Sequence, residues 1–298
     1  MAYLLQQLLN AVPVASLYAC LAFGYAIAFG VTRRPDISFG ALVALAGQIC
    51  LLFVDYGWGR LYLILPAALL LGVLAGFVYA LMVGWTSARY VMLPLHRRSA
   101  NSVIVASLGL VILISEGARL ALDTRSLWLP PLWQGQIVLA EMDGFTIGFS
   151  AIQLIHSALM VALVLAGQLV LTRSRAGRLW QSVCQDAFAA RLLGVDADRV
   201  FVVSLLASAT LAALAGLSAT LLYGTMDFGM GLMLGLKVVL IAAAGGHFRP
   251  MYSAIGAAGI GFAETLWSAY GPMIWRDAVI MAALVFLLVL SRRERIIP

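Results

Sequence analysis

Charged residues and cysteines are scarce in this 298-residue chain. Only 11% of the residues are charged, and the three cysteines, Cys20, Cys50 and Cys184, lie far apart with no CxxC or Cys/His spacing. This pattern predicts neither a disulfide framework nor a metal site. The sequence also lacks a GxxxxGK[ST] loop, paired carboxylates in a polar domain, and a Ser/His/Asp or Cys/His constellation. We therefore expect no enzyme active site, no metal and no cofactor on this chain.

Hydrophobic residues are abundant instead, at 63% of the chain, with a mean hydropathy of +1.00. A soluble domain of this length has too little interior to hide so many apolar side chains, whereas a lipid bilayer accepts them on the outside. The formal charge of +6 does not indicate nucleic-acid binding, because the charges sit in short loops between apolar runs and form no single basic face. The composition therefore predicts an all-α polytopic membrane protein that lies in the lipid bilayer.

Nine apolar runs divide the chain, at about residues 8–31, 37–54, 61–86, 101–122, 150–172, 200–222, 230–246, 251–270 and 277–291. The first run has no basic residue before it and no small-residue cleavage signature after it, so we expect a span there and not a signal peptide. Runs 37–54 and 230–246 are short and could be broken or re-entrant helices. We expect one transmembrane domain over residues 1–298, with eight or nine transmembrane segments.

The distribution of basic residues predicts how these runs are oriented in the membrane. With the carboxyl-terminal tail in the cytoplasm, 14 of the 19 Lys and Arg residues fall in inside loops, four fall outside, and Lys237 lies within a span. The positive-inside rule favours this arrangement, with the amino terminus outside. The segment at about 123–149 becomes an outside cap, in which Asp143-Gly144 is a turn signal for a small hairpin. The loop at about 173–199 becomes cytoplasmic.

This cytoplasmic loop contains apolar side chains at helical spacing. Leu179, Val183 and Leu192 fall on one face together with Ala187 or Phe188, and Gly194 is a natural helix stop. We predict one amphipathic helix over about 178–193 that docks onto a soluble partner. The alternative is an ordinary solvated loop that lies on lipid headgroups.

Four ionisable residues stand at membrane depth in the predicted topology. Lys237 and Glu264 lie within apolar runs, where an ionised group is costly unless it pairs or faces water, so both are functional candidates. A structural ion pair between two helices is the alternative. Asp36 and Asp227 each precede a Gly-containing helix start, where helix capping alone would explain an aspartate.

The surroundings of Asp36 and Asp227 resemble each other. Both have an aromatic-Gly pair before the aspartate, then Phe-Gly and a helix rich in small residues. In the predicted topology they lie on opposite sides of the membrane, as expected for an inverted repeat around a transport path. The abundance of Gly and Ala in packed membrane helices is the alternative explanation.

Four motifs together resemble the permease subunits of bacterial ABC importers of the branched-chain amino-acid type, a family that also includes urea and amide uptake systems. Two of them are Leu93-Pro94-Leu95-His96-Arg97, similar to a cytoplasmic turn of the family, and Gly235-Leu236-Lys237 through Gly245-Gly246. A third is Glu264 late in the following helix. The fourth resembles the loop that docks on the ATPase, and its matching residues are Gly177, Arg178, Gln185, Asp186, Ala189, Ala190, Leu193 and Gly194.

The resemblance implies an ABC importer permease fold in a bacterial inner membrane. It implies as partners two ABC ATPase subunits, which carry the ATP and Mg²⁺, a second homologous permease, either a second copy or a different chain, and a periplasmic solute-binding protein. It leaves open amino acids, urea, short amides and small carboxylates as solutes. The implied substrate path comprises Asp36, Ser38, Phe39, Gly40, Tyr223, Asp227, Phe228, Lys237 and Glu264.

One departure from the family concerns its early I-N-F-A-H-G motif. Here Asp36 replaces the asparagine and Phe39 replaces the histidine, which implies a different substrate preference if this segment lines the path. Two other functions stay open from the residues alone. One is an ion-coupled secondary transporter that uses Lys237, Glu264 and Asp36 as a relay, and the other is a scaffold that transports nothing.

Overall fold

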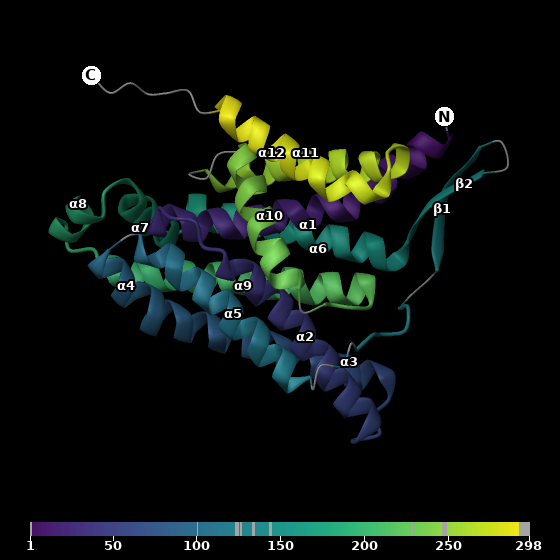
Figure 1. The fold of residues 1–298 in the computed structure, drawn as a ribbon, viewed down its shortest axis with the longest axis horizontal. Coiled ribbons are helices and arrows are strands. Elements are labelled where there is room, and N and C mark those ends of the chain that lie inside the picture. Colours follow the sequence, from purple (N-terminus) through teal and green to yellow (C-terminus); the bar gives the residue numbers. More distant parts are fainter. Residues whose placement is uncertain are drawn as a thin grey trace.

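Long helices that run side by side make up most of the protein. The computed structural model describes residues 2–99, 101–122, 125, 127–132, 135–142, 145–227, 229–245 and 249–291. Figure 1 shows the short helices α7 and α8 at one end of the molecule, and the amino terminus with a β-hairpin at the other. Helices suit a membrane because each one satisfies its own backbone hydrogen bonds without water.

Six helices in the described part are long and apolar enough to cross a membrane, when the third is followed through to Arg98. These six helices are α1 (Ala2–Thr32), α2 (Ser38–Gly59), α3 (Leu65–Thr86), α5 (Ser102–Ala121), α6 (Ala151–Arg173) and α9 (Ala197–Tyr223). Three further apolar helices follow, α10 (Met230–Gly245), α11 (Pro250–Tyr270) and α12 (Arg276–Ser291), with the 3₁₀ turn η2 (Met273–Trp275) before the last. All nine predicted runs are helical, which confirms the all-α class, and the number that cross the membrane stays a prediction.

Helices α1 and α2 form the centre of the bundle. About 89% of the most apolar stretch of α1 and 83% of that of α2 are buried, against 22% for α6. Helix α1 packs against α6, α9 and α11, and α2 packs against α3, α9 and α10. Of the alternatives left open for run 37–54, a broken helix does not hold, because α2 continues unbroken over Ser38–Gly59. Neighbouring helices bury α2 on several sides, so it can form a continuous helix although its apolar run is short.

The third helix extends further than the sequence predicts. Helix α3 continues through a π-helical segment, η1 (Ser87–Met92), into α4 (Leu93–Arg98). Residues Leu93–Arg97, which resemble a turn of the family, are therefore helical and not a turn, and their cytoplasmic placement stays a prediction. Pro94 cannot donate a backbone hydrogen bond, and the wider π turn, in which Leu93 N–H bonds to the Ala88 carbonyl, absorbs the misfit that a proline causes inside a helix.

The predicted hairpin is present in the segment that we expected to cap the outside. Strands β1 (Gln136–Met142) and β2 (Phe145–Ser150) pair antiparallel, and the turn residues 143 and 144 lie outside the described residues. The amide of Gln6 holds the hairpin to α1, because it both donates to the Gly148 carbonyl and accepts from the Gly148 N–H, each at 3.0 Å. The amino terminus and the cap therefore lie at the same end of the molecule.

Glycine lets α2 and α10 cross at close range. A methyl group on Gly40 would lie 2.1 Å from the backbone nitrogen of Gly235 and 2.5 Å from the Gly231 carbonyl oxygen. Such a contact is sterically forbidden, so the two backbones can meet only if position 40 has no side chain. We expect Gly40→Ala to lower stability by about 1–3 kcal/mol or more, because overpacking forces helices apart.

Thermal unfolding of the purified protein in detergent measures this effect. Gly259→Ala is the matched control, because a methyl group there would meet nothing within 4 Å and alanine favours a helix by about 0.5–1 kcal/mol over glycine. Equal melting temperatures for the two variants would contradict the close crossing.

Candidate functional site

Two short helices, α7 (Arg175–Gln185) and α8 (Ala187–Leu192), form the loop at the end opposite the hairpin. Helix α7 is anchored by one face. The indole N–H of Trp180 donates to the Ile27 carbonyl of α1 at 3.1 Å, and Val183 is buried beside it. At the start of α7, Gly177 packs so closely on α6 that a methyl group would lie 2.0 Å from the Leu171 carbonyl oxygen. Helix α7 is therefore packed onto the bundle.

The predicted single helix over 178–193 is wrong, because the chain breaks at Asp186. The carboxylate of Asp186 accepts from the N–H groups of Phe188 and Ala189 at 2.8 Å and 3.1 Å, and so starts α8 as a separate helix. An aspartate that caps the next helix outweighs the continuous apolar spacing. The predicted stop is confirmed, since Gly194 has a φ of 82°.

The most exposed apolar side chains of the loop lie on α8 and immediately after it. Phe188, Leu192 and Leu193 are 70%, 73% and 84% exposed, whereas Val183, predicted for the same apolar face, is buried. Of the other predicted coupling residues, Arg178, Gln185, Asp186 and Ala189 are also exposed, and Ala190 is buried. Sequence reasoning missed Trp180, which a search for buried aromatic side chains in α7 could have found.

Arg33 connects the end of α1 to the end of α7. Its guanidinium group donates to the carbonyl oxygens of Cys184 and Gln185, at 2.5 Å and 2.7 Å. A cation at this position complements the partial negative charge of a helix carboxyl terminus. Burial raises the pKa of the neighbouring Cys184 thiol to about 12, so this thiol stays protonated at neutral pH. Arg33 therefore joins the end of α1 directly to the end of α7.

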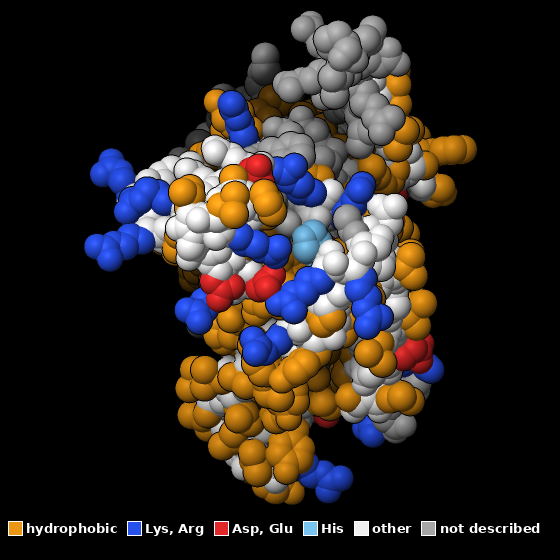
Figure 2. All heavy atoms as spheres, turned by 90° about the vertical axis from the view of Figure 1, so that its left-hand side faces the viewer, with side chains coloured by type: hydrophobic (Ala, Val, Ile, Leu, Met, Phe, Trp, Pro, Cys, Tyr) orange, Lys and Arg blue, Asp and Glu red, His pale blue; other side chains and the backbone are white. Residues whose placement is uncertain are grey.

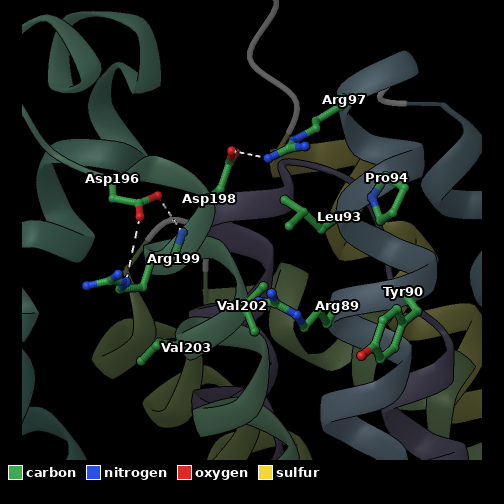
Figure 3. Close-up of a pocket in the computed structure, with 10 residues that line it drawn as sticks. All are labelled: Arg89, Tyr90, Leu93, Pro94, Arg97, Asp196, Asp198, Arg199, Val202 and Val203. Carbon is green, nitrogen blue, oxygen red and sulfur yellow. Dashed lines mark hydrogen bonds and ion pairs between the residues drawn. The ribbon is translucent and has the colours of Figure 1, made fainter.

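A second surface lies beside the loop, where α4 meets α9. The carboxylate of Asp198 binds Arg97 of α4 and Arg191 of α8, the latter at 3.0 Å. Figure 3 shows the open cavity next to this cluster, with Arg89 and Tyr90 on one wall and residues of α9 on the other. Its volume is about 530 Å³. Figure 2 shows that basic side chains gather over this end of the molecule.

The predicted partnership of Lys237 and Glu264 is confirmed. The ammonium of Lys237 in α10 lies 2.7 Å from the Glu264 carboxylate of α11, and the two side chains are 12% and 8% exposed. The hydroxyl of Tyr18 in α1 donates to the other Glu264 oxygen at 2.8 Å. Three helices thus meet at one buried charge pair.

Sequence reasoning missed two members of this cluster. Arg276, at the first position of α12, has its Nε 3.8 Å from Glu264 and 3.3 Å from Asp277, and Asp277 lies 3.6 Å from Lys237. The sequence signal that could have identified them is that two adjacent opposite charges, Arg276 and Asp277, stand at the start of an apolar run. Two cations and two carboxylates balance one another, and Asp277 is 54% exposed, so the cluster extends from the interior to the surface.

Helix α10 begins inside the bundle. Gly231 packs on Ala41 and Ala44 of α2, and the Gln48 amide donates to the Asp227 carbonyl at 3.2 Å. Together with the crossing at Gly40, these contacts make α10 antiparallel to α2, and the inverted repeat stays a prediction. At 16 residues, α10 is about 24 Å long, shorter than a hydrocarbon core of about 30 Å.

The remaining predicted path residues lie on both sides of this crossing. Asp36 is 7% exposed and accepts from the N–H and hydroxyl of Ser38, at 2.9 Å and 2.5 Å. Phe39 is buried against Tyr25 of α1. Tyr223 and Asp227 are exposed, and Phe228 lies outside the described residues, as does Gly246 of the motif after Lys237.

Asp36 is separate from the Lys237–Glu264 pair among the described interactions. Its carboxylate lines a cavity of about 20 Å³ towards η1 and α9, whereas α10 lies on the Gly40 side of α2. The described residues hold no cluster of three or more His, Cys, Asp or Glu side chains that would bind a metal ion. The geometry is that of a helix bundle with a buried ion pair, a helix that begins inside the bundle, and a loop at one end whose first helix packs onto α1 and α6.

Comparisons of the sequence with known proteins found one matching family and several relatives. The sequence model of one family, described as the permease component of branched-chain amino acid transport systems, matches residues 7–289. LivH of Escherichia coli K12, a high-affinity branched-chain amino acid transport system permease protein, is 28% identical over 298 residues, which cover 96% of this chain and 93% of LivH. LivH of Salmonella typhimurium is 27% identical over 297 residues, with coverage of 96% and 93%. BraD of Pseudomonas aeruginosa, a permease protein of the same description, is 24% identical over 286 residues, with coverage of 95% and 92%. No solved structure matches this chain.

Proposed function

This chain belongs to the family of permease components of branched-chain amino acid transport systems, and we propose its function on that basis. It is the transmembrane subunit of a binding-protein-dependent ABC importer in a bacterial inner membrane. Its solute is an amino acid of the branched-chain type or a related small polar molecule, with urea and amides in the same class. The chain itself carries no ATPase activity, and ATP and Mg²⁺ bind to two separate ATPase subunits.

The observation that carries this proposal is that α10 begins inside the helix bundle, beside the middle of α2. The first N–H groups of a helix carry partial positive charge and attract anionic groups, so a helix that begins inside a membrane offers a binding site there. Asp227 and Tyr223 stand at this start, and Gly40 allows α2 to approach it closely. The solute path passes between these helices, with the Lys237–Glu264 pair behind α10.

The loop of α7 and α8 supports the coupling role. Its apolar tip of Phe188, Leu192 and Leu193 is too exposed to stabilise the isolated chain, whereas a groove on an ATPase subunit would bury it. Arg33 and Trp180 then transmit motion of the loop to α1. The loop faces the cytoplasm and the hairpin faces outside, where a periplasmic binding protein delivers the solute and a second homologous permease completes the path.

Reconstitution tests this proposal. The chain, its partner permease, two ATPase subunits and the binding protein are placed in proteoliposomes with ATP inside, and uptake of labelled leucine, urea and acetamide is measured. We expect uptake of at least one solute to require ATP and the binding protein, and to continue when a protonophore removes the proton gradient. Uptake that survives ATP depletion but stops with the protonophore would instead support an ion-coupled transporter, and no uptake of any solute would support a scaffold.

A further inference from the structure

The cavity between the end of the third helix and the start of α9 has a charged end and an apolar end. Arg97 and Asp198 line it in the terminal turns of α4 and α9. Tyr90 and Val203 line it about two helical turns further into the bundle. Its volume of about 530 Å³ lies within the range of about 300–1,000 Å³ that is usual for small-molecule sites. The cavity therefore suits a ligand with one charged and one apolar part.

Arg89 of η1 lines this cavity without a carboxylate partner. Its exposed side chain extends across the cavity towards Val202 of α9 (Figure 3), and it makes no hydrogen bond or ion pair within the described part of the chain. The other charged groups beside the cavity pair with one another, Asp198 with Arg97 and Arg191, and Asp196 with Arg199. Four guanidinium groups thus meet two carboxylates, and the excess positive charge attracts an anion.

The wall that carries Arg89 continues the exposed apolar face of α3. Val78, Met82 and Trp85 are 51%, 57% and 42% exposed, and Arg89 follows Trp85 at the same spacing of three to four residues. The ring of Tyr90 packs edge-on against Trp85, with the ring centroids 5.7 Å apart. Trp and Tyr side chains gather where lipid headgroups meet hydrocarbon. The cavity therefore lies at headgroup level, with its apolar end towards the hydrocarbon.

The protein partners proposed above do not supply an anion to Arg89. An ATPase subunit would dock on the tip of α8, whereas Arg89 lies nine residues before the end of α4 at Arg98, about 13 Å along the helix. If a second copy of this chain used the same face, a two-fold axis would bring further guanidinium groups to it, because both sides of such an interface are the same surface. The phosphate of a membrane lipid carries the required negative charge at this level.

We propose that the cavity binds an anionic phospholipid, with its phosphate on Arg89 and its acyl chains along Tyr90 and Val203. A planar guanidinium group donates to two phosphate oxygens at once, and basic pockets between membrane helices bind anionic headgroups in this way. Arg97 faces the same headgroup, because its guanidinium has further N–H groups besides the one that binds Asp198. The bound lipid then links the third helix to α9. This assignment requires a membrane around the chain and does not depend on the proposed transport function.

Native mass spectrometry tests this assignment on the chain alone and on the assembled complex, each titrated with phosphatidylglycerol or phosphatidylcholine in mild detergent. We expect phosphatidylglycerol to bind more tightly, and Arg89→Gln to raise its Kd at least about tenfold through loss of a charge-assisted hydrogen bond. Val203→Trp fills the apolar end, keeps every charge, and should weaken binding similarly. Arg173→Gln is the matched control, because Arg173 is exposed at the last position of α6 and does not line the cavity. We expect it to leave the Kd unchanged.

Three results would overturn the assignment. Equal losses in Arg89→Gln and Arg173→Gln, or no loss in Val203→Trp, would show that the basic surface attracts lipid without a site. Displacement of phosphatidylglycerol by millimolar inorganic phosphate would show a site for free phosphate. Phosphatidylglycerol that binds the chain alone but not the complex would show that an ATPase subunit or the second permease fills the cavity.

Discussion

Phe188→Asp/Leu192→Asp is expected to abolish association with the ATPase subunits and leave the permease folded. Both side chains are more than two thirds exposed on α8, and neither holds the loop to the bundle, because Trp180 and Val183 do so. Truncation of a central apolar anchor in an interface costs about 2 kcal/mol or more. The two substitutions together should therefore weaken binding by at least about 100-fold. Co-purification with the ATPase subunits and ATP-driven uptake measure the effect.

Tyr62→Asp is the control for this experiment. Tyr62 is an apolar side chain of similar size with 87% exposure, and it lies between α2 and α3, in the segment where the predicted topology crosses to the outside. We expect it to leave ATPase binding unchanged. If the α8 variant still co-purifies with the ATPase at wild-type levels, the loop is a surface segment that lies on lipid headgroups and the docking role is rejected.

Lys237→Met and Glu264→Gln are each expected to destabilise the protein, and the double variant is expected to restore stability but not transport. Removal of one partner leaves the other charge buried, which typically costs about 3–5 kcal/mol. Arg276 and Asp277 lie within 4 Å of the pair and reduce this loss toward about 3 kcal/mol. The double variant leaves no unpaired charge at the centre, and replacing a buried pair by neutral groups is often neutral for stability. Thermal unfolding in detergent and leucine uptake distinguish the two effects.

Asp277→Asn is the matched variant for the exposed rim of this cluster. Because Asp277 is 54% exposed, we expect its loss to cost at most about 1 kcal/mol. A double Lys237→Met/Glu264→Gln variant that recovers both melting temperature and uptake would show a purely structural ion pair and would remove Lys237 and Glu264 from the path.

The candidate site was partly readable from the chain. The Lys237–Glu264 pair was found because an ionised residue in an apolar run demands a partner, and one lysine and one central glutamate leave few choices. Arg276 and Asp277 were missed, because their contacts with Lys237 and Glu264 join segments that the apolar pattern does not connect.

The sequence by itself determined the nine apolar helices, the hairpin and the polar loop, because hydropathy, turn residues and Gly194 act over a few neighbouring positions. Only the tertiary structure decided which face of each element is buried. Trp180 anchors α7 because α1 offers the Ile27 carbonyl, and Phe188 and Leu192 stay exposed because Asp186 starts a new helix. The close crossing of α2 and α10 exists because two glycine-containing surfaces meet, and a contact between distant segments leaves no local pattern.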